Sequence, residues 1–165
     1  DYASFVAWRD WGRPDASVRN CFGSPVVLTS DRALMFGEMA ASTLNGGKIY
    51  PPGGSLEPRD IMADGTVDVL GSIATELREE TGLNAAEARG GAMVAIREGH
   101  RIAVCQALTF DLTVAEIARR FAAHGDPEGE LTRLVAIRSA AEASARMPAF
   151  AQEIVRRFGL WFESP

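Results

Sequence analysis

Cysteine is scarce in this sequence, which has two in 165 residues. Cys21 and Cys105 are too few for a disulfide framework and too far apart for a zinc motif. No apolar run approaches the roughly eighteen residues that a membrane-spanning helix needs, and no signal peptide is visible. We therefore expect a protein of the reducing cytoplasm with no membrane partner.

Basic residues are also fewer than acidic residues. The sequence has 17 Lys and Arg against 22 Asp and Glu, which gives a formal net charge of -5 at pH 7. Because binding to a nucleic-acid polymer or an anionic membrane relies on basic patches, we expect neither partner. A small nucleotide-type substrate stays compatible with this charge, because a metal ion can supply positive charge locally.

The rest of the composition is typical of one globular domain, with 47% hydrophobic and 24% charged residues. We expect a single domain over residues 1–165, with an N-terminal arm at 1–23 and a C-terminal helical segment at 138–165. The arm mixes aromatic residues with arginines, which could stack on a base or bind a phosphate. We favour an arm that packs on its own domain or on a second copy, so a homodimer stays open.

The most informative stretch is Glu76 to Leu83. Its three glutamates, Glu76, Glu79 and Glu80, are three and four residues apart, so a helix places them on one face. Like charges at this spacing cost a few tenths of a kcal/mol unless a cation lies among them. Mg²⁺ and Mn²⁺ prefer clustered carboxylate oxygens and would fit. The alternative is a solvated helix face, which is what most charged runs are.

The surroundings of these glutamates favour a site. A strand-like stretch leads to the glycine pair Gly53-Gly54, and a loop rich in turn formers follows. A helix is predicted from Asp68, as its N-cap, to Thr81, with Gly82 as a left-handed C-cap. Apolar residues recur at helical spacing about a quarter turn from the carboxylates: Leu70, Ile73, Ala74 and Leu77. The carboxylates therefore border the buried face, which suits the edge of a cleft.

This stretch resembles the Nudix box, G-x5-E-x7-R-E-U-x-E-E-x-G-U with U an aliphatic residue. The matching positions are Glu76, Leu77, Glu79, Glu80, Gly82 and Leu83. The beginning of the box matches in part, since the sixth residue after Gly54 is Asp60, where the family has Glu. Fourteen residues instead of seven separate Asp60 from the box arginine position, which is Thr75. Aligned from the helix end, the first glutamate's place falls on Val67, beside Asp68.

The resemblance covers about residues 24–137. It implies an α/β (α+β) fold, a Nudix-like α/β/α sandwich with a mixed sheet, to which this chain adds C-terminal helices. It also implies a metal-dependent hydrolase that cleaves the pyrophosphate bond of a nucleoside diphosphate linked to another moiety, with Mg²⁺ or Mn²⁺ as cofactor. The implied catalytic and metal-binding residues are Glu76, Glu79 and Glu80, and the carbonyl of Gly53 is a further metal ligand.

Two questions stay open in the sequence. Many Nudix enzymes take a further acid or base from a loop after the box, for which Glu128 and Glu130 are eligible beside Asp60; the alternative is a solvated turn. In the family the box arginine orients a catalytic glutamate, and Thr75 is too short and uncharged to do so. The alternative function is therefore a catalytically impaired nucleotide-binding or regulatory module. Against it, a protein that no longer bound metal would keep three carboxylates that repel one another.

Overall fold

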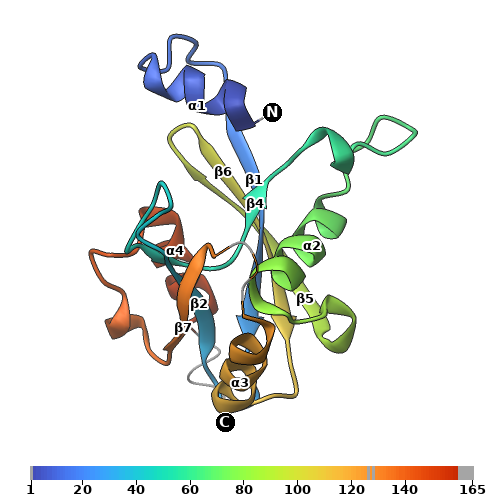
Figure 1. The fold of residues 1–165 in the computed structure, drawn as a ribbon, viewed down its shortest axis with the longest axis vertical. Helices are drawn as coiled ribbons and strands as arrows, with labels where there is room; N and C mark the ends of the chain where they lie inside the picture. The colour runs from blue at the N-terminus through green and yellow to red at the C-terminus, as the bar shows by residue number, and fades with distance from the viewer. Residues whose placement is uncertain (1, 126, 128, 160–165) are drawn as a thin grey trace.

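The structure is a computed structural model, which describes residues 2–125, 127 and 129–159. Within these residues a seven-stranded mixed sheet forms the centre of the molecule (Figure 1). The strands are β1 Asn20–Leu28, β2 Leu34–Met39, β3 Ile49–Tyr50, β4 Gly54–Ser55, β5 Arg89–Glu98, β6 Arg101–Thr109 and β7 Leu131–Ile137. The α-helices are α1 Tyr2–Asp10, α2 Val69–Thr81, α3 Val114–His124 and α4 Ala149–Phe158, and the short 3-10 helices are η1 Pro58–Asp60, η2 Ala85–Glu87 and η3 Ala140–Glu142.

Strand β1 lies at the middle of the sheet and changes its neighbour halfway along. On one side it runs parallel to β6 over its whole length. On the other side its first half pairs with β4 at Gly23 and Gly54, and its second half pairs with β2 at Val27. Pro25 lies between these two pairings, where its nitrogen has no hydrogen to donate. The sheet therefore opens beside Pro25, and the glycine pair enters at that opening.

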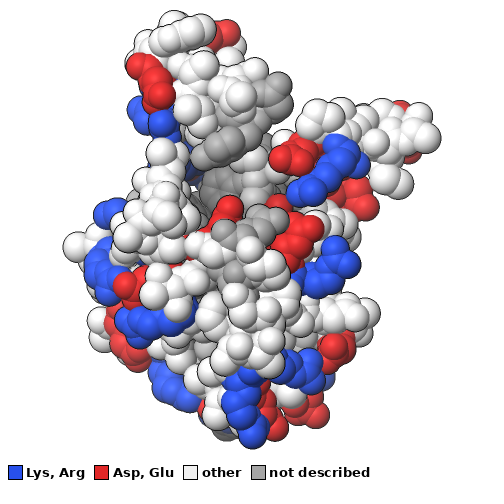
Figure 2. Space-filling model, viewed as in Figure 1, with Lys and Arg blue, Asp and Glu red and all other residues white. Residues whose placement is uncertain are grey.

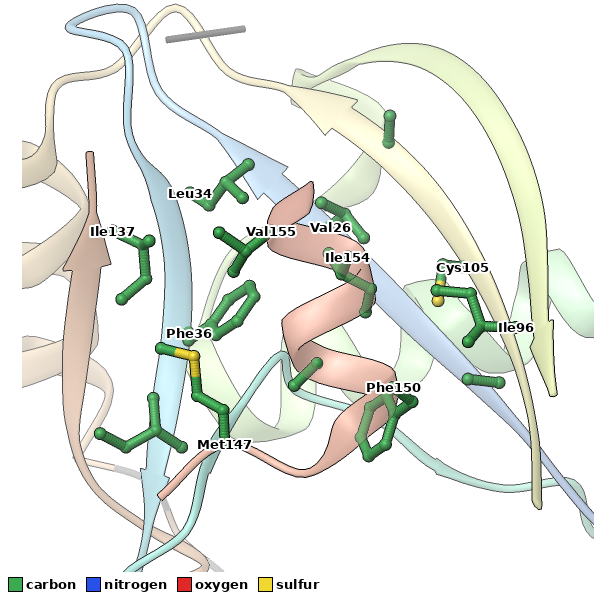
Figure 3. Packing of buried hydrophobic residues seen from close by; sticks show 14 of the residues in the cluster. Val26, Leu34, Phe36, Ile96, Cys105, Ile137, Met147, Phe150, Ile154 and Val155 are labelled. Atoms are coloured by element: carbon green, nitrogen blue, oxygen red, sulfur yellow. The ribbon is translucent and has the colours of Figure 1, made fainter. Parts of the chain in front are cut away.

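Both faces of the sheet are covered, as the α/β/α sandwich predicted from the resemblance requires. Alternate residues of β1 point to opposite faces, so Val26 packs under α4 while Val27 packs under α2 and α3. Figure 3 shows the α4 side, where Phe150, Ile154 and Val155 meet the sheet. The C-terminal segment contains one α-helix and one 3-10 helix among the described residues, and β1 begins at Asn20, inside the predicted arm of residues 1–23.

Helix α2 has the ends that the sequence predicts. The Asp68 side chain accepts a hydrogen bond from the Gly71 amide at 2.8 Å, and Gly82 closes the helix with a φ of 72°. Ile73 and Leu77 are fully buried against the sheet, but Leu70 is 46% exposed and is not part of the core. The helix rotates so that Ile73 rests on β1, which leaves Leu70 at the solvent edge.

Asp31 ties three elements together at the end of the molecule away from α1. It accepts hydrogen bonds from the Val114 amide of α3 at 2.9 Å and from Arg138, after β7, at 2.7 Å. The Arg138 guanidinium, helped by hydrogen bonds from Thr29 and Val114, lowers the pKa of Asp31 to about 2. Because the folded pKa lies below the ordinary 3.8, the stabilisation is present above pH 4 and is lost as the pH falls towards 2.

We expect Asp31→Asn to lower the free energy of unfolding at pH 7 by about 1 kcal/mol, a value discounted because the carboxylate is 35% exposed. The difference from wild type should shrink as the pH falls from 4 to 2. Urea unfolding at several pH values measures it, with the exposed Asp111→Asn as the control. A difference that stays constant over this range would show that the Asp31 charge does not stabilise the fold.

No helix in the described part of the chain is long and apolar enough to cross a membrane.

Candidate functional site

The three glutamates of α2 differ in burial. Glu80 is 5% exposed, while the side chains of Glu76 and Glu79 are 14% and 33% exposed. Arg78 lies on the solvent side of the helix, with a 68% exposed side chain whose Nη2 is 3.9 Å from Glu79 Oε1. The carboxylates therefore occupy the border between the core and solvent that the helical spacing predicts.

The glycine pair lies directly against this border. Gly53 adopts a φ of 156°, and a Cβ at this position would overlap the Gly23 carbonyl oxygen of β1. Its amide donates a hydrogen bond of 2.9 Å to Glu80 Oε1. Glu80 thus fixes the glycine pair to α2.

Gly54 is equally close to α2. A Cβ added to Gly54 would overlap the Glu76 carboxylate, because that carboxylate lies over the Gly54 backbone. Gly54 itself is held in place by pairing with Gly23 of β1. The absence of a side chain at Gly54 therefore sets the position of Glu76.

A pocket of about 690 Å³ opens from these residues towards α1. The acidic side is lined by Gly53, Gly54, Glu57, Arg59, Glu76, Glu79 and Glu130. The remaining wall includes the aromatic side chains of Phe22, Tyr50 and Phe150, together with Arg9, Arg13, His100 and Arg101. Figure 2 shows the hollow between α1 and the rest of the molecule, with acidic side chains at its margin. The pocket therefore combines an acidic side, an aromatic side and a basic side.

Glu130 reaches the same pocket from the start of β7. Its carbonyl accepts a hydrogen bond from the Ala40 amide at 2.8 Å, which holds the backbone in place. The pKa of Tyr50 is raised to about 12, chiefly by burial and also by the charges of Glu80 and Glu130, while a hydrogen bond from Asn45 opposes the shift. Both carboxylates thus act on one phenol, so Glu80 and Glu130 approach the same part of the site.

Arg59 is a site residue that the sequence reasoning did not find. It lies in η1, inside the extended loop after the glycine pair, and its Nη2 is 3.7 Å from Glu76 Oε1. Its Nε is also 3.1 Å from Glu57 Oε2. A guanidinium therefore stands beside the box carboxylates although the box arginine position is Thr75. No local pattern signals this, because Arg59 precedes Glu76 by seventeen residues.

The other predicted residues are placed as follows. Asp60 does not line the pocket; its Oδ2 accepts a hydrogen bond from the Glu57 amide at 2.7 Å and closes η1. Glu128 lies outside the described residues. Within the described residues, no group of three or more His, Cys, Asp and Glu side chains is gathered as a metal ion would require. Glu80 is turned to the Gly53 amide and Glu76 faces Arg59, which explains why the carboxylates do not converge.

Comparison with known proteins defines the fold. No protein-family model matches the sequence, and no curated protein matches it. Solved structures do match: a MutT protein from Methanosarcina mazei Go1 has a TM-score of 0.56 at 16% identity, with 86% of this chain and 93% of that chain covered. A MutT NUDIX hydrolase from Burkholderia pseudomallei has a TM-score of 0.53 at 10% identity, with 84% and 96% covered.

A bifunctional NMN adenylyltransferase/ADP ribose pyrophosphatase from Francisella tularensis also matches, with a TM-score of 0.58 at 16% identity. The match covers 93% of this chain and 44% of that protein, so this chain spans less than half of its length. A second structure of that enzyme, at 17% identity, is complexed with AMP and a Mn ion. The chain has the fold of the Nudix hydrolases, and the predicted fold class is confirmed.

Proposed function

We propose that this protein is a metal-dependent pyrophosphohydrolase that cleaves the diphosphate of a nucleoside diphosphate linked to another moiety. One observation carries the proposal: Glu76 and Glu79 line the same pocket as Gly53 and Gly54, while Glu80 is hydrogen-bonded to the Gly53 amide. The Nudix fold of the chain supports this assignment, and so does a pocket of about 690 Å³, which is large enough for a nucleotide.

The residues of the acidic side fit a divalent cation by their chemistry. Carboxylate and carbonyl oxygens are the ligands that Mg²⁺ and Mn²⁺ prefer, and the bare Gly54 backbone leaves room for the Glu76 carboxylate beside it. Glu76, Glu79 and Glu80, with the Gly53 carbonyl, would hold the cation. A bound Mg²⁺ or Mn²⁺ would neutralise charge on the diphosphate oxygens. Binding requires Glu76 and Glu79, whose side chains are 14% and 33% exposed, to turn from their present positions.

The chain's own groups supply the remaining parts of the reaction. Tyr50 stays protonated at neutral pH and, with Phe22 and Phe150, offers an apolar surface for a sugar or a base. Phe150 packs edge-on against Phe22 with ring centroids 5.3 Å apart, so this surface is rigid. Glu130 is a carboxylate at the pocket wall and is our candidate for the group that takes a proton from the attacking water.

If Glu130 is the general base, Glu130→Gln should lower kcat by about 10²- to 10⁴-fold and leave KM within about twofold. The glutamine keeps the size of the side chain and its carbonyl oxygen, so the pocket should keep its shape. The rate of the variant should also lose its dependence on pH in the acid range, which a purely structural role would not change. An unchanged rate would instead identify Glu130 as part of a solvated turn.

The alternative function is nucleotide binding without hydrolysis, and Thr75 at the box arginine position favours it. Arg59 weakens this alternative, because its guanidinium provides a cation beside Glu76 from another part of the chain.

A substrate panel tests the proposal. Nucleotide sugars, dinucleoside polyphosphates, coenzyme A species and nucleoside triphosphates would each be incubated with Mg²⁺ or Mn²⁺, and the products separated by anion-exchange chromatography. We expect at least one diphosphate-linked compound to yield a nucleoside monophosphate and a second phosphorylated product, with no turnover in EDTA. Binding of a nucleotide without turnover of any compound would support the alternative.

A further inference from the structure

The basic side of the pocket is unexpected in a protein with a net charge of -5. Its three arginines come from separate places: Arg9 from α1, Arg13 from the turn after α1, and Arg101 from the start of β6. Helix α1 brings the first two there by packing on the turn between β5 and β6, where the Trp8 and His100 rings are 5.5 Å apart. The fold therefore assembles a basic wall from two arginines of the predicted N-terminal arm and a third from β6.

The position of this wall relative to the glycine pair follows from strand register. On β6, Val104 lies opposite Gly23, which pairs with Gly54 on its other side. Arg101 precedes Val104 by three residues, so the backbone of Arg101 is displaced from the glycine pair by about 10 Å in the direction of the strands. The aromatic surface lies in the same pocket. A group bound by the arginines would therefore be distinct from the diphosphate beside Gly54.

The charges at the wall are only partly compensated. Arg9 pairs with Asp10 at 2.7 Å, and Arg101 is 3.9 Å from Glu98. Among the described residues, no carboxylate lies within ion-pair distance of Arg13. Arg13 also adopts a φ of 61°, a left-handed conformation that is uncommon for residues other than glycine. Burial lowers the pKa of His100, and the charges of Arg13 and Arg101 lower it further, which reflects an excess of positive charge here.

We propose that Arg9, Arg13 and Arg101 bind a second anionic group of the substrate, a phosphate monoester at the end remote from the diphosphate. A guanidinium recognises phosphate through two parallel hydrogen bonds. Arg13 can bind a phosphate in this way, because no carboxylate among the described residues pairs with it. The inference rests on the proposed function and narrows its substrate class. The class is a nucleoside diphosphate derivative that carries an additional phosphate.

Matched substrate pairs that differ by one phosphate test the inference. Suitable pairs are ADP-ribose 2′-phosphate with ADP-ribose, NADPH with NADH, and coenzyme A with its dephosphorylated form. In at least one pair we expect kcat/KM to be about tenfold or more higher for the phosphorylated member. UDP-glucuronate against UDP-glucose distinguishes a carboxylate from a phosphate. Equal rates within every phosphate pair, or a preference confined to the uronate, would overturn the inference.

Substitutions in the basic wall test whether its arginines cause the preference for phosphorylated substrates. Arg13→Gln removes the guanidinium and its charge but keeps a polar side chain, and it should lower the phosphorylated-to-unphosphorylated ratio of kcat/KM about tenfold. Arg101→Gln should lower the same ratio and provides a second variant if Arg13→Gln folds poorly. Arg119→Gln removes an exposed arginine of α3 outside the pocket and should leave the ratio unchanged. Equal losses for both members of a pair would contradict a role in binding the extra phosphate.

Binding in EDTA separates this inference from the proposed function. Calorimetry would compare adenosine 2′,5′- and 3′,5′-bisphosphate with AMP, and the wild type should bind one bisphosphate about tenfold more tightly than AMP. Arg13→Gln should bind all three alike. Tighter bisphosphate binding in a protein that hydrolyses nothing would support the anion site and refute the hydrolase. Hydrolysis without any bisphosphate preference would refute the anion site alone.

Discussion

Glu79→Gln is expected to lower kcat by about 10²- to 10³-fold, the usual effect of removing one charged group placed at a reacting centre. Glu79 lines the pocket, and among the described residues its carboxylate has one ion pair to lose, a distant one of 3.9 Å to Arg78. The free energy of unfolding should therefore change by less than about 1 kcal/mol. Initial rates on the best substrate of the panel, together with urea unfolding, measure both effects.

The matched control is Glu87→Gln, which removes an exposed glutamate outside the pocket that pairs with Arg120. Its rate should equal that of the wild type. If Glu79→Gln also matched the wild type, the glutamate run would be an ordinary solvated helix face.

Gly54→Ala is expected to lower kcat/KM by about 100-fold, because a misplacement of roughly 1 Å at a reacting centre has an effect of this size. The new methyl group would overlap the Glu76 carboxylate and force it away from the glycine pair. The overlap involves only the end of a flexible side chain, so the protein should remain folded. The control is Gly90→Ala on β5, where the nearest atom would be 3.5 Å away and no effect is expected.

A double-mutant cycle identifies the cause of the Gly54→Ala loss. If the methyl group acts through Glu76, then Gly54→Ala should have little further effect in a Glu76→Gln background. Fully additive losses would mean that Gly54 contributes through the backbone instead of through the position of Glu76.

The α/β/α sandwich could be predicted only through the resemblance to the Nudix box, while the limits of α2 could be predicted from local signals. Caps at Asp68 and Gly82 define α2. The start of β1 at Asn20, within the range predicted as an N-terminal arm, has no such local signal. A proline inside a central strand is tolerated here only because β1 changes its neighbour at that point, which is a property of the sheet.

The site could be predicted only where its residues are close in sequence. The box glutamates and the glycine pair come from neighbouring segments, and the structure brings Gly53 and Glu80 within hydrogen-bond distance. The sequence raised the arginines of the arm as phosphate ligands, but their position could not be predicted and neither could that of Arg59, because a loop, helix α1 and a β-turn must all pack before these side chains share the pocket. Thr75 illustrates what the sequence could not predict. The sequence shows that the box arginine is replaced by threonine, but only the structure places the guanidinium of Arg59 beside Glu76.

The most direct test of the central claim is a calorimetric titration of the wild-type protein with Mn²⁺ in the presence and absence of a nucleotide. Saturable binding is predicted, because the α2 carboxylates repel one another and a cation relieves this repulsion. The Glu76→Gln/Glu79→Gln variant should lose most of it while remaining folded by circular dichroism. A folded wild-type protein that binds no Mn²⁺ even with nucleotide present would contradict the account.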